Sequence, residues 1–310
     1  MPGKRKPIRT GPRRFPAFPR SATRTLVALI SLLVLAAALA AAAELKEDTV
    51  AAWNSYVRQV ESVLDRRGTG GSAFLWVDES PDRKQGVLAG ALLAVPQDLR
   101  SVPHGLIHHW IGAMFIPGAT LDEVRRVLAD YGRYPDFYRP MVVNSKLIER
   151  TEDYERATLL MTEKAFAVTA AVQIDEEAHV RRLDANRMCM MSHSVRVQEI
   201  TNYGEADEHM FPEGQGPGYV WRTLGISRVE QRDGGAYVEV EMIDLSRNIP
   251  AVLRWIVKPL TQKVSRGIVL DVLKDTEDAV RREVQADASG TPKKSRPVSR
   301  AGAYAPAATF

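Results

Sequence analysis

The sequence predicts an α+β fold, with an antiparallel sheet of about seven strands, a long C-terminal helix and a helical extension at the N-terminus. Extended apolar runs follow one another between residues 141 and 245 with no long helical pattern among them, which favours an antiparallel meander. An amphipathic stretch from Pro250 to about Val284 predicts the terminal helix. The 310 residues are 45% hydrophobic and 26% charged, which is typical of a globular protein.

The first 43 residues have the pattern of an export signal. Eight basic residues and no acidic residue accompany an apolar run from Leu26 to Ala43, which ends in small side chains that a signal peptidase accepts. We therefore expect an exported protein, periplasmic or secreted, from which residues 1–43 are removed. As a helix this run is about 27 Å long, close to the hydrocarbon thickness of a bilayer, so membrane association through an uncleaved anchor at residues 26–43 is the alternative.

The net charge of +4 is unevenly distributed along the chain. Residues 44–285 carry a net charge of −7, because the basic excess lies in the leader and in the last 25 residues. A basic footprint for nucleic acid is therefore absent from the part that folds, and no nucleic-acid partner is expected. Cys189 is the single cysteine, so no internal disulfide can form, and we expect its thiol to be inert.

Residues 44–103 are expected to form a helix and short strands packed on the main domain. Val50, Trp53, Val57, Val60 and Leu64 recur at spacings of three and four before a glycine, which predicts a helix from residue 44 to about 67. Two short extended runs are then predicted at residues 74–77 and 87–95.

The main domain is predicted at residues 104–284, beginning with an apolar strand from Gly105 to Phe115. Thr120 and Glu123 have the spacing of a capping box at the start of a helix, and a short helical turn follows at residues 134–140. A hairpin turn is expected at Asp233-Gly234-Gly235. Six strands are predicted, at residues 141–149, 154–163, 168–180, 188–200, 219–230 and 237–245.

The terminal helix is expected to kink near Lys258, because Pro259 lacks the amide proton that an interior helical hydrogen bond needs. Residues 285–310 are rich in alanine, serine, proline and basic residues without an apolar period, which predicts a disordered tail.

This order of elements resembles the START-like superfamily, also called the helix-grip, pollen-allergen-like or SRPBCC fold. Its members include lipid-transfer domains, polyketide cyclases and aromatases, and coenzyme-Q-binding proteins, and the segment around Trp53 is similar to exported members of unassigned function. The resemblance covers about residues 104–284. It implies a curved sheet that grips the terminal helix around an apolar cavity. The sequence features that carry it are Trp110, Ile116-Pro117-Gly118, Asp130-Tyr131, Tyr134-Pro135, Tyr138-Arg139-Pro140 and the terminal amphipathic helix.

The resemblance implies an exported binding protein that holds a hydrophobic small molecule such as a lipid, an isoprenoid or a polyketide-like compound. Methionine and tryptophan suit the wall of such a cavity, although the same side chains also fill dry cores, and both interpretations are kept open. The candidate ligand-binding residues are Trp110, Met114, Tyr138, Met161, Met190, His193, Trp221, Met242 and Trp255.

The alternative is an enzyme similar to polyketide cyclases and aromatases, using the same cavity to position a substrate and move protons. Arg196, Arg222, His193 and Tyr219 are the residues available for that, and no catalytic residue is carried over from the family. A third alternative is a scaffold that binds a protein partner through its acidic face.

No cofactor and no metal site are predicted. His108 and His109 are neighbours in a predicted strand, where their side chains point to opposite faces and cannot share a metal ion. We expect one histidine of this segment to face solvent and one to lie in the cavity wall. The glycines at residues 214–218 join two strands with no helix after them, so they predict a loop at the cavity mouth and no phosphate site.

Overall fold

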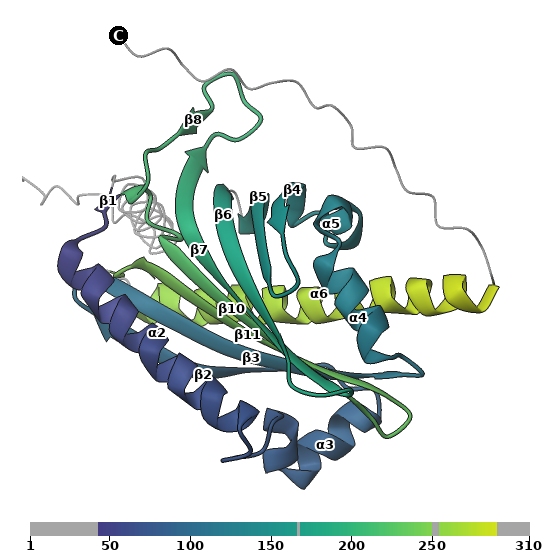
Figure 1. Cartoon of the computed structure of the whole chain (residues 1–310). Coiled ribbons are helices and arrows are strands. Elements are labelled where there is room, and N and C mark those ends of the chain that lie inside the picture. The colour runs from purple at the N-terminus through teal and green to yellow at the C-terminus, as the bar shows by residue number, and fades with distance from the viewer. Residues whose placement is uncertain (1–42, 166–167, 250–253, 290–310) are drawn as a thin grey trace, which may run out of the picture. The chain divides into compact units, whose positions relative to one another are not determined.

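Figure 1 shows the computed structural model of the chain, which describes residues 43–165, 168–249 and 254–289. The predicted leader and anchor lie almost wholly outside the described residues. In the part that is described, no helix combines the length and apolar character needed to cross a membrane.

The described residues form one large antiparallel sheet, in the order β2-β3-β11-β10-β7-β6-β5-β4, with the short β8 beside β7. This confirms the predicted antiparallel meander. A two-stranded pair, β1 (Ala43–Glu44) with β9 (Gln215–Gly216), lies outside this sheet. The strand bounds are β2 Leu93–Val102, β3 Gly105–Pro117, β4 Val142–Arg150, β5 Tyr154–Ala165, β6 Val168–Arg182, β7 Arg187–Thr201, β8 His209–Met210, β10 Arg222–Arg232 and β11 Gly235–Arg247.

Local sequence accounts for two of the connections. Asp233 and Gly234 have φ values of 56° and 80°, which is the left-handed pair of a tight hairpin turn between β10 and β11. Thr120 and Glu123 form the expected capping box, since each side chain accepts a hydrogen bond from the other residue's backbone N–H. The helix that begins there is α4 (Leu121–Ala129).

One face of the sheet, which we call the inner face, is crossed by α6 (Arg254–Ser289) (Figure 1). Gly112 of β3 lets the helix approach closely, because a Cβ atom there would lie 2.5 Å from Val269 Cγ1 and 2.9 Å from Leu273 Cδ1. The helices α4, η2 (Tyr131–Arg133) and α5 (Tyr134–Phe137) pack at one end of α6. The predicted helix-grip fold is therefore confirmed.

The terminal helix is not broken near Lys258, because α6 continues through Pro259, and the kink there stays a prediction. Pro259 lacks the amide proton for one intrahelical hydrogen bond, and the described helix runs from Arg254 to Ser289 on both sides of it. The helix also extends to Ser289, into the segment predicted as a tail, and residues 290–310 lie outside the described residues.

The opposite face, which we call the outer face, is covered by α2 (Glu47–Gly68), η1 (Trp76–Glu79) and α3 (Pro81–Leu88) (Figure 1). Trp53 and Tyr56 of α2 pack against Ile107, Ile243 and Leu245. The predicted strand at residues 74–77 is wrong and the next run, at residues 87–95, forms a strand only from residue 93, because Ser80 and the proline after it begin a helix in between.

A chain of buried polar groups attaches α2 to the outer face. Tyr56 Oη lies 2.9 Å from His109 Nδ1, and His109 Nε2 lies 2.7 Å from Glu241 Oε2. Burial would raise the pKa of Glu241, but hydrogen bonds and charge from His109 and Arg228 lower it to about 2. His109 is buried beneath α2, and the histidine of this segment that faces solvent is His104, whose side chain is 64% exposed.

The same chain attaches η1. Arg228 is 1% exposed and contacts both Glu241 and Glu239. Glu239 also accepts hydrogen bonds from the backbone N–H groups of Trp76, at 3.0 Å, and Val77, at 2.9 Å. Arg228, Glu239 and Glu241 are thus paired with one another and with a covering segment, which indicates a structural role for them.

Candidate functional site

The inner face of the five strands β3, β11, β10, β7 and β6 divides into transverse rows, because paired residues on adjacent strands project to the same side. The row nearest to α4 is wholly apolar on four strands, and its members are at most 2% exposed. These residues are Met114, Val238, Val229 and Met188. This end of the inner face is therefore a dry core.

The next two rows change in character along the strands. The first consists of Gly112, Val240, Ser227, Met190 and Val180, and the second of Trp110, Met242, Gly225, Ser192 and Ala178. Ser227, Val180, Met242, Gly225 and Ser192 are only half-buried. Because these strands lie inside the sheet and away from its edges, partial exposure means that solvent reaches the inner face here.

The fourth row is polar on every strand. It consists of His108 on β3, Asp244 on β11, Thr223 on β10, Ser194 on β7 and Glu176 on β6. Ser194 is buried and accepts a 2.9 Å hydrogen bond from the backbone N–H of Thr223, and the other four residues are half-buried. We call these five residues the polar row. Five neighbouring strands span about 19 Å, so the row crosses much of the inner face.

The polar row lies toward the beginning of α6. Farther along the helix, Thr276 is 3.0 Å from the hydroxyl of Tyr138 in the segment after α5, and Ala279 and Val280 pack with α4. At the opposite end of the sheet, β11 finishes at Arg247, which is paired with Gly105 at the start of β3. The inner face is thus dry where the second half of α6 packs and polar where the helix begins.

Burial changes the protonation of three members of this row. It raises the pKa of Asp244 to about 7 and lowers the pKa of His108 to about 4. Burial also raises the pKa of Glu176 to about 7, against a lowering hydrogen bond from Tyr131. The His108 ring, with Nε2 3.1 Å from Ser246 Oγ, is therefore neutral at pH 7, and both carboxyl groups titrate near neutrality.

A compact ion cluster closes the side of the inner face near η2. Glu155 has no exposed surface, and its Oε1 accepts hydrogen bonds from Arg125 Nη2 at 2.6 Å and from Arg150 Nε at 2.9 Å. These two arginines are committed to Glu155, so they are paired within the protein wall.

Six of the nine predicted ligand-binding residues lie on the inner side. Trp110, Met114, Tyr138 and Met190 belong to one buried cluster together with α6, and Met161 and Met242 are half-buried against it. Met114 lies at the dry end, whereas Trp110 and Met242 lie in the row beside the polar row.

The other three predicted residues lie elsewhere. Trp221 packs with Trp53 and Tyr56 beneath α2, on the outer side. His193 alternates with the inner-facing Ser192, so it points outward, where its Nε2 is 3.8 Å from Glu177. Trp255 is 76% exposed on α6.

The residues that sequence reasoning made available for proton transfer are also outside the inner face. Arg196 pairs with Asp175 at 2.6 Å, and Arg222 pairs with Glu213 at 3.0 Å. Tyr219 is half-buried in the connection before β10.

The glycine-rich segment at residues 214–218 is held to the neighbouring sheet through Glu199. This buried carboxylate accepts backbone hydrogen bonds from Gly218 at 2.5 Å, Tyr219 at 2.5 Å and Val220 at 3.0 Å. The backbone donors that would otherwise attract an anion are therefore occupied by a side chain of the protein.

Asp244 and Glu176 are the site residues that sequence reasoning missed. Asp244 has the same strand parity as Val240 and Met242, so the alternation already places it on the apolar side of β11. Glu176 has the same parity as Ala178 and Val180, but it lies among other acidic residues, which resemble a solvated segment.

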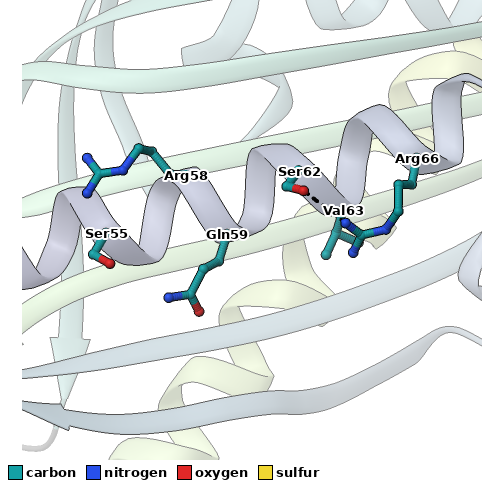
Figure 2. Close-up of a pocket in the computed structure, with 6 residues that line it drawn as sticks. All are labelled: Ser55, Arg58, Gln59, Ser62, Val63 and Arg66. Carbon is teal, nitrogen blue, oxygen red and sulfur yellow. Dashed lines mark hydrogen bonds between the residues drawn. The ribbon is translucent and has the colours of Figure 1, made fainter.

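Two surface depressions lie away from the inner face. One is a shallow strip along the solvent side of α2, where Arg66 Nη1 donates a 2.8 Å hydrogen bond to Ser62 (Figure 2). The other lies beside β1 and includes Lys46, Trp221 and Arg247. No group of three or more His, Cys, Asp or Glu side chains suited to a metal ion occurs among the residues that the structure describes.

No protein-family model and no curated protein sequence matches the chain. Similar solved structures include a STAR-related lipid transfer protein from Xanthomonas axonopodis, 16% identical, covering 59% of this chain and 98% of that chain with a TM-score of 0.40. Another is the Zhui aromatase/cyclase from Streptomyces sp. R1128, 14% identical, covering 58% and 98% with a TM-score of 0.42. The human StAR-related lipid transfer protein 5 is 12% identical, covering 72% and 99% with a TM-score of 0.38.

Proposed function

We propose that the protein binds a hydrophobic small molecule between the inner face of the sheet and the first half of α6. The observation that carries this proposal is the partial exposure of Met242, Val180 and Gly225 on central strands, opposite a helix that covers the same face. Apolar side chains left partly exposed on a sheet face opposite a helix are suited to line a small-molecule site.

The gradient of polarity supports the same proposal. A dry apolar end, two rows of mixed character and a polar row together make an amphipathic surface about four residue pairs long. An apolar ligand seated there would remove the exposed parts of Met242 and Met161 from water, at about 25 cal/mol for each Å² covered.

Binding is tested by titrating the purified protein with Nile red, whose emission rises in apolar surroundings, and by extracting the protein with organic solvent to identify released molecules. Met242→Trp fills the mixed rows and is expected to reduce Nile red affinity at least about fivefold. Val195→Trp, at a half-exposed position of β7, is the matched control and should leave the affinity unchanged. If the wild-type protein neither enhances Nile red emission nor releases an apolar molecule, the proposal fails.

We also propose that the protein acts outside the cytoplasm, because a basic segment followed by an apolar run with small terminal residues is typical of an export signal. Expression of the full chain followed by N-terminal sequencing of the extracytoplasmic fraction tests this. A mature chain that begins near Glu44 supports cleavage, full-length protein in the membrane fraction supports the anchor, and full-length protein in the cytoplasm refutes export.

A second candidate is an enzyme of the cyclase type. Asp244 and Glu176 favour it, because carboxyl groups with a pKa of about 7 on one inner face can exchange protons at neutral pH. Turnover of a linear poly-β-ketone by the wild type, lost in Asp244→Asn with ligand affinity retained, would support this candidate. Absence of turnover with any such substrate would leave binding as the function.

A further inference from the structure

The polar row has a composition that restricts what it can hold. It contains two carboxyl groups, one imidazole and two hydroxyl groups, and no lysine or arginine (His108, Asp244, Thr223, Ser194 and Glu176). Arg125 and Arg150, which lie on this side of the sheet, are both paired with the buried Glu155. An anionic group placed against the row would meet acidic side chains without a cation of the row to balance it.

Asp244 is the member most available to a ligand. Ser194 bonds to the backbone of Thr223, His108 lies within hydrogen-bond distance of Ser246, and Glu176 interacts with Tyr131. Among the residues whose side chains the structure describes, Asp244 has no hydrogen bond or ion pair. A half-buried carboxyl group that faces solvent-accessible space without a protein partner is a docking point for a polar group.

The protonation of the row agrees with its composition. Burial raises the pKa of Asp244 to about 7, and the neutral form of this carboxyl group both donates and accepts a hydrogen bond. Burial keeps the His108 ring neutral, with a pKa of about 4, so it also offers one donor and one acceptor. Hydroxyl and carbonyl groups match these partners, whereas a carboxylate, a phosphate or a sulfate would be repelled by ionised Asp244 and could accept only from its protonated form.

The neighbouring row defines the rest of the ligand. Trp110 and Met242 lie one pair farther along the strands from the polar row, and Met190 and Val240 one pair beyond them. A molecule that places a polar end at Asp244 therefore extends its body along apolar side chains. The arrangement orients the ligand along the strands, with its polar end toward the beginning of α6.

We propose that the polar row holds the uncharged, hydroxyl- or carbonyl-bearing end of an otherwise apolar ligand, and that Asp244 makes the protein discriminate against anionic amphiphiles. This inference rests on the proposed binding function and adds the chemical class of the ligand.

The test compares ligands with the same chain and different ends. Dodecan-1-ol, dodecanoate and dodecyl sulfate, each below its critical micelle concentration at pH 8, compete with Nile red for the wild-type protein. We expect the alcohol to bind at least about tenfold more tightly than either anion, because only the alcohol can hydrogen-bond with Asp244 in both of its protonation states. Equal or tighter binding of the anions overturns the proposal.

The variant Asp244→Leu removes the polar group and should bring the ratio of alcohol to anion affinity down toward one. Asp175→Leu, on the outer side of β6, is the matched control and should keep the wild-type ratio. An unchanged ratio in Asp244→Leu would assign discrimination to other residues and refute the role of Asp244. If Asp244→Leu does not fold, the wild-type ratio still decides the ligand class.

The two proposals fail in different ways in this experiment. Without Nile red binding, the binding function itself is wrong. With Nile red binding and no preference for the alcohol, binding stands and the assignment of the polar row is wrong.

Discussion

Replacing Asp244 by asparagine should make the protein more stable at pH 8 than the wild type and leave a much smaller difference at pH 5. Burial raises the pKa of Asp244 from its ordinary value of 3.8 to about 7 in the folded protein. Between these two values the folded state holds a proton that the unfolded state has lost, so the free energy of unfolding falls as pH rises through this window and levels off above it.

The magnitude follows from the width of the window. One pKa unit corresponds to about 1.4 kcal/mol, so the two units between pH 5 and the folded pKa amount to about 3 kcal/mol. Asparagine has nearly the same shape and does not titrate. The difference in unfolding free energy between Asp244→Asn and the wild type should therefore grow by up to about 3 kcal/mol from pH 5 to pH 8.

The assay is urea unfolding followed by tryptophan fluorescence at several pH values. Glu152→Gln, at an exposed position between β4 and β5, serves as the control and should change the free energy of unfolding by less than about 0.5 kcal/mol at each pH. If the difference in unfolding free energy between Asp244→Asn and the wild type is the same at every pH, Asp244 is well hydrated and its burial does not raise its pKa.

Four further variants test the packing by the same urea assay. Gly112→Ala should lower the free energy of unfolding by about 2 kcal/mol, because its Cβ would overlap side chains of α6. Gly267→Ala, whose Cβ would meet no atom within 4 Å, should raise the free energy of unfolding by roughly 0.5–1 kcal/mol. Tyr56→Phe should cost about 1 kcal/mol, through the lost hydrogen bond to the histidine of β3. Glu239→Gln should lower the free energy of unfolding by roughly 3 kcal/mol, because it leaves the buried Arg228 with one carboxylate. A decrease below about 1 kcal/mol would mean that water takes the place of the lost carboxylate at the guanidinium.

Elements with a strong local signal were predictable from the sequence. The six strands between residues 141 and 245, the capping box at Thr120 and the turn at Asp233 are each defined by neighbouring residues, and the structure contains them all. The segment at residues 74–77 was misassigned because a short apolar run looks the same in a buried strand and in a buried helical turn. Tertiary contacts with the outer face decide between them, and these contacts cannot be read locally.

The residues of the candidate site were predictable only where the alternation of side chains along a strand decides which face of the sheet they occupy. Trp110, Met114 and Met242 alternate within regular strands, so their common face follows from the sequence once the sheet order is known. Trp221 lies at the end of a connection, where alternation has not begun, and its packing under α2 depends on contacts with residues far away in the chain. The exposure of Trp255 depends on how α6 is rotated about its axis, and the packing of α6 on the sheet determines that rotation.

The adjacent residues His108 and His109 point to opposite faces of β3, and the polar groups around them are paired differently. His109 faces outward into a chain in which Tyr56, Glu241 and Arg228 are each paired, and such a chain stabilises the attachment of α2. His108 faces inward beside Asp244, which is half-buried and unpaired among the described side chains. A half-buried carboxyl group can complete its hydrogen bonds with water or with a polar group of a ligand, so Asp244 supports the proposed binding site on the inner face, whereas the ion pairs of the outer face attach the covering segments.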